Sequence, residues 1–232
     1  MKYLQPRRQR LILIFISIVY FNIKLVYSDE IIKYNIIKFG MKVGSATLEF
    51  HEKEKLDDKE VCLILFTATA LNFFDEERIF IDPKTFYPIQ IKRDLNIWGN
   101  KEKIIETYLK SGKISIVKED CKGNISKQII DKGTMTDNIY GVIYRYREQG
   151  AFEIGEEFKV NLPTKDINIK LIQEITISIG GKRYQSYYLT SKPKQYFLWF
   201  DTSKDKIPLR IDGAVGLKKT SMRMISYQKI NK

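Results

Sequence analysis

Apolar and polar residues alternate along most of the chain, and the alternation is clearest between residues 167 and 179. Isoleucine or leucine occupies every second position there apart from Gln173, and the intervening positions are polar apart from Ile172. A helix would spread these apolar residues around its circumference, so the pattern predicts a β-strand with one buried face. Gly180 and Gly181 follow and suit a tight turn, which makes 183–190 the returning strand of a hairpin.

The same pattern recurs in short segments separated by Gly, Pro and Asn turn signals. It predicts further strands at 30–39, 45–51, 61–71, 78–81, 89–95, 104–109, 113–117, 125–130, 196–200, 209–212 and 218–227. We therefore expect an all-β fold, mainly antiparallel, in which about ten to twelve strands form a single curved sheet or a partly closed barrel.

One segment departs from this pattern. Residues 137–148 place Ile139, Tyr140, Ile143 and Tyr144 at helical spacing, and Thr136 and Asp137 precede them as candidate caps. We expect one short helix here, which covers an open end of the sheet because a lone amphipathic helix must bury its apolar stripe.

The first 28 residues have the organisation of a secretory signal peptide. Basic residues precede an apolar run of about eleven residues at 11–21, which is too short to span a bilayer, and small or branched residues follow at 26–28. We expect a signal-peptide helix at 1–28, followed by a single β-rich domain at 29–232 with no transmembrane span once the signal is cleaved. The alternative is that this segment is retained as an anchor.

The charge and composition of the chain limit the kinds of molecule that we expect it to bind. The chain is 44% hydrophobic and 29% charged with a formal net charge of +12, and five of its basic residues lie in the first 28 positions. The remaining basic residues are interspersed with acids, which is typical of a solvated surface and not of a nucleic-acid groove. We therefore expect no nucleic-acid partner.

Familiar catalytic and metal-binding motifs are absent from the sequence. His51 is the only histidine and lies among acidic and basic residues at a strand end, where an exposed side chain is the ordinary outcome. The acidic groups at 75–77 and 156–157 are expected on solvated loops or sheet edges, although a facing pair of carboxylates could support glycoside hydrolysis. We expect no cofactor, no metal and no catalytic residue.

The chain has two cysteines, which could form one disulfide within the chain. An exported protein could join Cys62 to Cys121, but Cys62 lies in the apolar run 61–66, where a buried free thiol also packs well.

Aromatic residues are the strongest candidates for a binding function. The chain has 14 Tyr, 13 Phe and 2 Trp, many of them crowded into 184–200, and either core packing or an apolar groove accounts for them. As candidates that line such a groove we select Tyr144, Tyr188, Phe197 and Trp199.

Four segments resemble, in order and spacing, motifs of the DUF3108 family of exported bacterial proteins. They are 40–48 (GMKVGSATL), 80–88 (FIDPKTFYP), 137–147 (DNIYGVIYRYR), and 198–200 (LWF) together with 206–211 (KIPLRI). The resemblance extends over about residues 34–227 and implies an envelope protein with a barrel-like antiparallel sheet, one helix and no catalytic residues. A relation to lipoprotein-carrier folds is an analogy of fold only.

These observations favour an exported, non-enzymatic protein that is either free in the periplasm or associated with the outer membrane. We expect it to bind an apolar or lipid-like ligand, a lipidated protein or an envelope protein partner in the concave face of its sheet. The alternatives are a carboxylate-based hydrolase of envelope polysaccharide and an outer-membrane barrel, which the high charge content disfavours.

Overall fold

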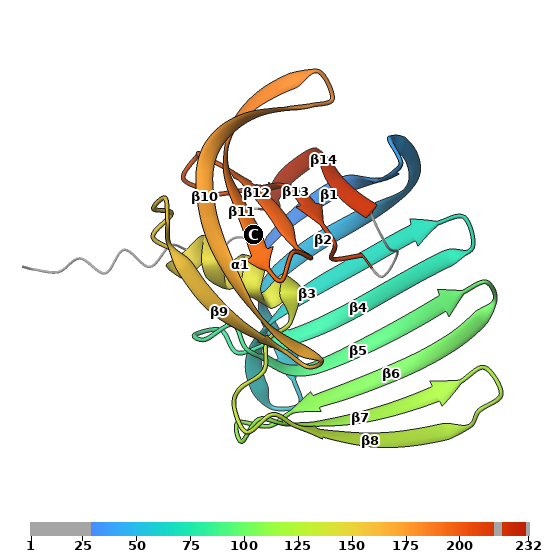
Figure 1. The fold of residues 1–232 in the computed structure, drawn as a ribbon. Coiled ribbons are helices and arrows are strands. Elements are labelled where there is room, and N and C mark those ends of the chain that lie inside the picture. Colours follow the sequence, from blue (N-terminus) through green and yellow to red (C-terminus); the bar gives the residue numbers. More distant parts are fainter. Residues whose placement is uncertain (1–28, 216–219, 231–232) are drawn as a thin grey trace, which may run out of the picture.

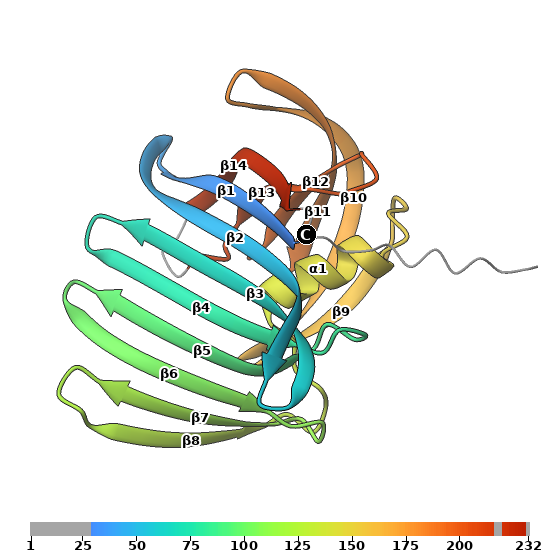
Figure 2. The same ribbon diagram turned by 180° about the vertical axis from the view of Figure 1, so that it is seen from behind.

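A computed structural model describes residues 29–215 and 220–230, which form one antiparallel sheet of 14 strands and one helix (Figures 1 and 2). The predicted signal peptide lies outside the described residues. The elements are β1 (Asp29–Lys38), β2 (Met41–Leu56), β3 (Lys59–Ala70), β4 (Phe73–Ile81), β5 (Pro88–Ile97), β6 (Asn100–Tyr108), β7 (Lys113–Asp120), β8 (Ile125–Asp131), α1 (Ile139–Gln149), β9 (Glu157–Leu162), β10 (Lys165–Ile179), β11 (Lys182–Lys192), β12 (Phe197–Asp201), β13 (Pro208–Asp212) and β14 (Thr220–Ile230).

The sheet consists of two meanders joined at β1 and β14. Strands β1 to β8 follow one another across the sheet, the chain crosses through α1, and β9 to β14 return until β14 pairs with β1. The sheet is curved but not closed, and its two edges are β8 and β9. At one end the two halves approach each other, because Nζ of Lys132, just after β8, lies 2.9 Å from Asp166 of β10.

Alternating burial explains why these segments are strands. In β1, for example, Ile32, Tyr34 and Ile36 are completely buried, and the residues between them face away from the core. The predicted all-β antiparallel class with one helix is confirmed.

The predicted number of strands was too low. The missed element is β9, whose sequence EFKVNL alternates correctly but contains only three apolar residues and is followed at once by Pro163. Strand β9 is ordered because it pairs with β10 along its whole length, from Glu157 to Leu162.

Helix α1 begins one residue later than its expected caps. Asn138 is the N-cap, and its side-chain oxygen accepts hydrogen bonds from the backbone N–H groups of Tyr140 and Gly141. Asp137, one of the two candidates, instead forms an ion pair with Arg145 at 2.6 Å.

The helix lies on the concave side of the sheet, at one end, and contacts both meanders (Figure 2). Tyr144 stacks on Phe50 of β2 at 4.7 Å between ring centroids, and Tyr140 stacks on Phe66 of β3 at 4.3 Å. On the other side, the Tyr146 ring stacks on Phe158 of β9 at 4.7 Å. Offset aromatic contacts of this kind add to the free energy of burial, so α1 stabilises the bend between the two meanders.

A buried ion pair fixes the C-terminal half of the helix. The guanidinium of Arg147 donates to both carboxylate oxygens of Glu30 in β1, and the two side chains are 4% and 2% exposed. Arg147 also donates to the carbonyl oxygen of Asp205 at 3.0 Å and 3.2 Å, in the turn between β12 and β13. One side chain thereby joins the helix, the first strand and a late turn.

The two cysteines do not form the disulfide that the sequence left open. Both thiols are free, with Cys62 buried in β3 and Cys121 exposed in the turn after β7. Three strands separate β3 from β7, so the two residues are at least roughly 19 Å apart at the usual interstrand spacing, and a disulfide needs Cα atoms within about 7 Å. Burial raises the pKa of the Cys62 thiol to about 12, which makes it an unreactive core side chain.

We predict that Arg147→Met and Glu30→Gln each lower the free energy of unfolding by about 3 to 5 kcal/mol, because each leaves one buried charge without its partner. The double variant should cost clearly less than the sum of the two single changes, since it removes both charges. Urea denaturation monitored by circular dichroism measures all three values.

The matched control is Arg78→Met. Arg78 pairs with Glu76 at 3.0 Å but is 57% exposed, so its loss should change stability by less than about 1 kcal/mol. If the buried and the exposed arginine variants were equally stable, Arg147 would not hold the helix in the way described.

Candidate functional site

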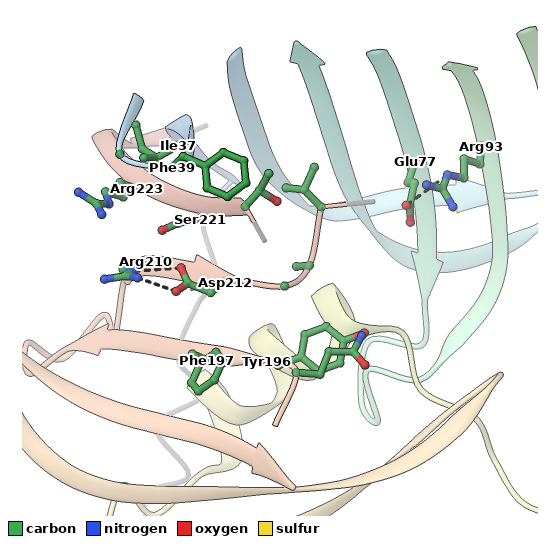
Figure 3. Close-up of a pocket in the computed structure, with 16 residues that line it drawn as sticks. Ile37, Phe39, Glu77, Arg93, Tyr196, Phe197, Arg210, Asp212, Ser221 and Arg223 are labelled. Carbon is green, nitrogen blue, oxygen red and sulfur yellow. Dashed lines mark hydrogen bonds and ion pairs between the residues drawn. The ribbon is translucent and has the colours of Figure 1, made fainter. Parts of the chain in front are cut away.

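A pocket of about 800 Å³ opens at the rim of the sheet, where the chain leaves β13 (Figure 3). Gly213 marks this point and adopts a φ of +86°. A Cβ atom here would lie 2.1 Å from the carbonyl oxygen of Gln195, so the close approach of the two segments requires glycine. The rim beside the pocket is therefore formed by backbone in close contact.

Apolar and aromatic side chains form part of the wall. Phe39, in the turn between β1 and β2, is 76% exposed, and Ile37, Tyr196, Phe197 and Val215 are the other large members. Exposed aromatic surface beside a concavity is typical of a site that binds an apolar group.

The pocket joins the two faces of the sheet. Leu198 and Ile211 pack in the core, so their strand neighbours Phe197, Arg210 and Asp212 project from the convex face. In Figure 3 these residues lie on one side of the pocket, and Glu77 and Arg93 lie on the other.

Two arginines face each other on the convex side. Arg210 of β13 pairs in register with Arg223 of β14. The carboxylate of Asp212 accepts two hydrogen bonds from Arg210, at 2.9 Å and 2.6 Å, and the Arg210 guanidinium lies 4.3 Å from the Trp199 ring centroid. Nε of Arg223 is buried and has no hydrogen-bond partner among the described residues. One carboxylate for two guanidinium groups leaves this side of the pocket positively charged.

On the concave side, Arg93 of β5 lies between two acids of β4. It donates to both oxygens of Asp75, at 2.7 Å and 2.6 Å, and its Nε lies 3.4 Å from Glu77. Asp75 is almost completely buried, whereas the Glu77 side chain is 12% exposed and lines the pocket.

Glu77 is poised to change charge near neutral pH. Burial raises the pKa of its carboxyl group to about 7, the guanidinium of Arg93 opposes this, and the negative charge of Asp75 adds to it. The pocket therefore contains a carboxyl group whose pKa is shifted upward by its burial.

The four aromatic residues that the sequence suggested lie in three places. Phe197 lines the pocket. Tyr188 and Trp199 stack on each other at 4.9 Å on the convex face. Tyr144 is completely buried between α1 and β2. The structure therefore does not bring the four together in one groove.

The acidic group at 75–77 was misjudged as solvated charge. Asp75 and Glu77 lie on the inward face of β4 together with Phe73 and Ile79. The alternation of Phe73, Asp75, Glu77, Ile79 and Ile81 was the available signal, but the arginine that makes their burial tolerable lies 16 residues beyond Glu77 on the next strand.

Both ring nitrogens of His51 lie near carboxylates. Its Nδ1 lies 3.4 Å from Asp29 and its Nε2 lies 3.5 Å from Glu49. Within residues 29–215 and 220–230, no group of three or more His, Cys, Asp or Glu side chains could hold a metal ion. In the same ranges, no helix has the length and apolar character that crossing a membrane requires.

A second, smaller pocket of about 470 Å³ lies beside α1. Lys84, Arg145 and Lys159 line it together with Glu156. Arg145 is paired with Asp137 and Lys159 with Asp166, so most of this positive charge is already balanced.

Comparison with known proteins supports the fold. No family model matches the chain, so the resemblance to DUF3108 stays a prediction, and no curated protein matches it. A solved structure described as a β-barrel-like protein of the domain of unknown function DUF1849, from Brucella abortus, is similar with a TM-score of 0.52 and 7% sequence identity. The similarity covers 88% of this chain and 99% of that one. It shows a common β-barrel-like fold.

We predict that Glu77 makes the fold less stable as the pH rises. Between its ordinary pKa near 4.5 and its pKa of about 7 in the folded protein, the unfolded chain has released a proton that the folded protein still holds. Relative to Glu77→Gln, the unaltered protein should lose about 2 to 3 kcal/mol of unfolding free energy between pH 5 and pH 8. Urea denaturation of both proteins at the two pH values measures this; an identical difference at both would contradict the assignment.

Proposed function

We propose that the chain is an exported protein of the cell envelope that binds a lipid-like molecule with an anionic group in the pocket at the rim of its sheet. The observation that carries the proposal is the composition of this pocket: aromatic and aliphatic walls meet two arginines of the convex side, Arg210 and Arg223, which have one carboxylate, Asp212, beside them. An acyl chain suits the first surface, and a carboxylate or phosphate suits the second.

The size of the pocket supports this class of ligand. A volume of about 800 Å³ is within the usual range of about 300 to 1,000 Å³ for small-molecule sites. The concave face next to β2 and β3 is filled by Tyr144 and Tyr140 of α1, so the proposal places the ligand at the rim and not beneath the helix.

The charge of the pocket supports an anionic group on the ligand. Arg210 already has Asp212 as a partner, whereas Arg223 keeps a buried Nε unsatisfied among the described residues. A buried donor without a partner is costly, and an anionic ligand would remove that cost. The predicted signal peptide at 1–28 is the basis for the envelope location.

A carboxylate-based hydrolase is less well supported by the geometry. Such an enzyme needs two acids that both reach the substrate. Two carboxylates line the pocket, Glu77 and Asp212, and each is already paired with an arginine, Glu77 with Arg93 and Asp212 with Arg210. These acids are better explained as ion-pair partners of Arg93 and Arg210.

We predict that the purified, delipidated protein binds a fluorescent fatty acid saturably at micromolar concentration. Phe197→Asp should weaken this binding by at least about tenfold, because it places a negative charge in the apolar wall and beside the anionic end of the ligand. Fluorescence titration measures both affinities, with circular dichroism to confirm that the variant is folded.

The matched control is Trp98→Asp, since Trp98 is also an exposed aromatic residue, 74% accessible in the turn between β5 and β6, but lies outside the pocket. This variant should bind like the unaltered protein. Absence of saturable binding, or equal weakening by both substitutions, would overturn the proposal.

A further inference from the structure

The two edges of the sheet differ in how they are protected. On β9, the backbone N–H of Asp137 donates to the carbonyl oxygen of Asn161 at 2.7 Å, and the Asp137 carboxylate accepts from the N–H of Asn161 at 2.8 Å. On β8, at the opposite edge, no described residue pairs with the outer side of the strand. Such an edge is a template for another strand.

The hydrogen bonds at the two ends of β8 show which backbone groups are free. The N–H of Lys132 donates to Gly112, and the carbonyl oxygen of Asn124 accepts from Asp120, so even-numbered residues face β7. The N–H and C=O groups of Ile125, Lys127, Ile129 and Asp131 therefore point outward from the edge.

The side chains of these same four residues form a mixed apolar and charged row on the convex face. Ile125 is 65% exposed and Ile129 is 73% exposed. Lys127 and Asp131 are also exposed, and they lie on either side of Ile129. Asp131 is 3.7 Å from Lys113 of β7, so charges already alternate across this part of the sheet.

We propose that the partner of this edge is a second copy of the chain, which pairs β8 with β8 in antiparallel orientation about Ile129. In this register Lys127 of each copy lies opposite Asp131 of the other, and the two Ile129 side chains lie opposite each other. The outward-facing backbone groups of the three residues form about six hydrogen bonds between the copies.

The charges of Lys127 and Asp131 favour the register centred on Ile129 over the registers centred on nearby residues. Pairing about Lys127 would place the two lysines directly opposite each other, which is repulsive. Pairing about Gln128 would place each charged residue opposite an isoleucine. Of these three registers, only the one about Ile129 places each charged residue opposite its counter-charge and the two Ile129 side chains opposite each other, and this complementarity favours self-association over an unrelated strand.

The contact is small, so the dimer is a reversible one. It consists of one strand from each copy, and interfaces of this size are at the weak end of the range for protein association. The dimer should therefore form with increasing protein concentration, and it should depend on the two charge pairs.

Charge reversal provides the test, measured by sedimentation equilibrium on the purified protein carrying Cys121→Ser, so that the exposed thiol cannot cross-link two copies. Lys127→Asp places two acids opposite each other at both pairs and should weaken dimerisation at least about tenfold. The double change Lys127→Asp with Asp131→Lys restores opposite charges and should restore the dimer.

The matched control is Ile105→Lys. Ile105 lies on the convex face of β6, is 43% exposed and is away from the edge, so this variant should dimerise like the unaltered protein. A protein that is monomeric throughout, or a dimer that Lys127→Asp leaves intact, would overturn the proposal. A dimer that the double change fails to restore would exclude the register about Ile129. Fatty acid binding by these variants should be unaffected, which separates this outcome from that of the proposed function.

Discussion

The architecture depends on the burial of α1 in the concave side of a sheet that does not close. The inner face of an open sheet needs to be covered, and α1, a helix of 11 residues, covers part of it through aromatic contacts with β2, β3, β9 and β12. The aromatic side of α1 contacts strands from both meanders, and Arg147 holds the helix to Glu30 at the position where β1 meets β14. Charges buried to this degree are tolerated because the Arg147 guanidinium donates to both carboxylate oxygens of Glu30 and twice to the carbonyl oxygen of Asp205. Without the aromatic contacts of α1 and the Arg147–Glu30 ion pair, the angle between the two meanders would not be fixed.

The pocket is a consequence of the same arrangement. The hydroxyl of Tyr140 in α1 donates to the carbonyl oxygen of Ala214 at 3.4 Å, which connects the helix to the segment beside the pocket. Asn138 caps the helix, and Arg93 and Glu77 lie on the strands that face its first turn. The charge of Glu77 and the position of the rim are therefore coupled to the docking of α1. The free edge at β8 is seven strands away from β1, where Arg147 of α1 binds Glu30. Ligand binding in the pocket and dimerisation through β8 can therefore be independent.

Period-two alternation was sufficient to predict the fold class, because each strand carries its own inward face in its own sequence. Residues that depend on a distant partner were not predictable in this way. Strand β9 has three apolar residues and is ordered by pairing with β10. Asp75 and Glu77 are buried beside Arg93 of the next strand, which donates two hydrogen bonds to Asp75 and lies 3.4 Å from Glu77. The pocket was missed for the same reason: Phe197 was selected, but Arg223, Tyr196 and Glu77 come together through register and not through sequence spacing. The expected helix was correct in place, and its cap was one residue away because Asp137 is engaged by Arg145.

Native-state hydrogen exchange of the backbone amides in α1 tests the central claim most directly. If docking of the helix fixes the bend of the sheet, these amides should exchange only through global unfolding, with protection equal to that of β1 and β2. Exchange of α1 at low denaturant, while β1 and β2 remain fully protected, would show that the sheet keeps its curvature without the helix and would contradict the account.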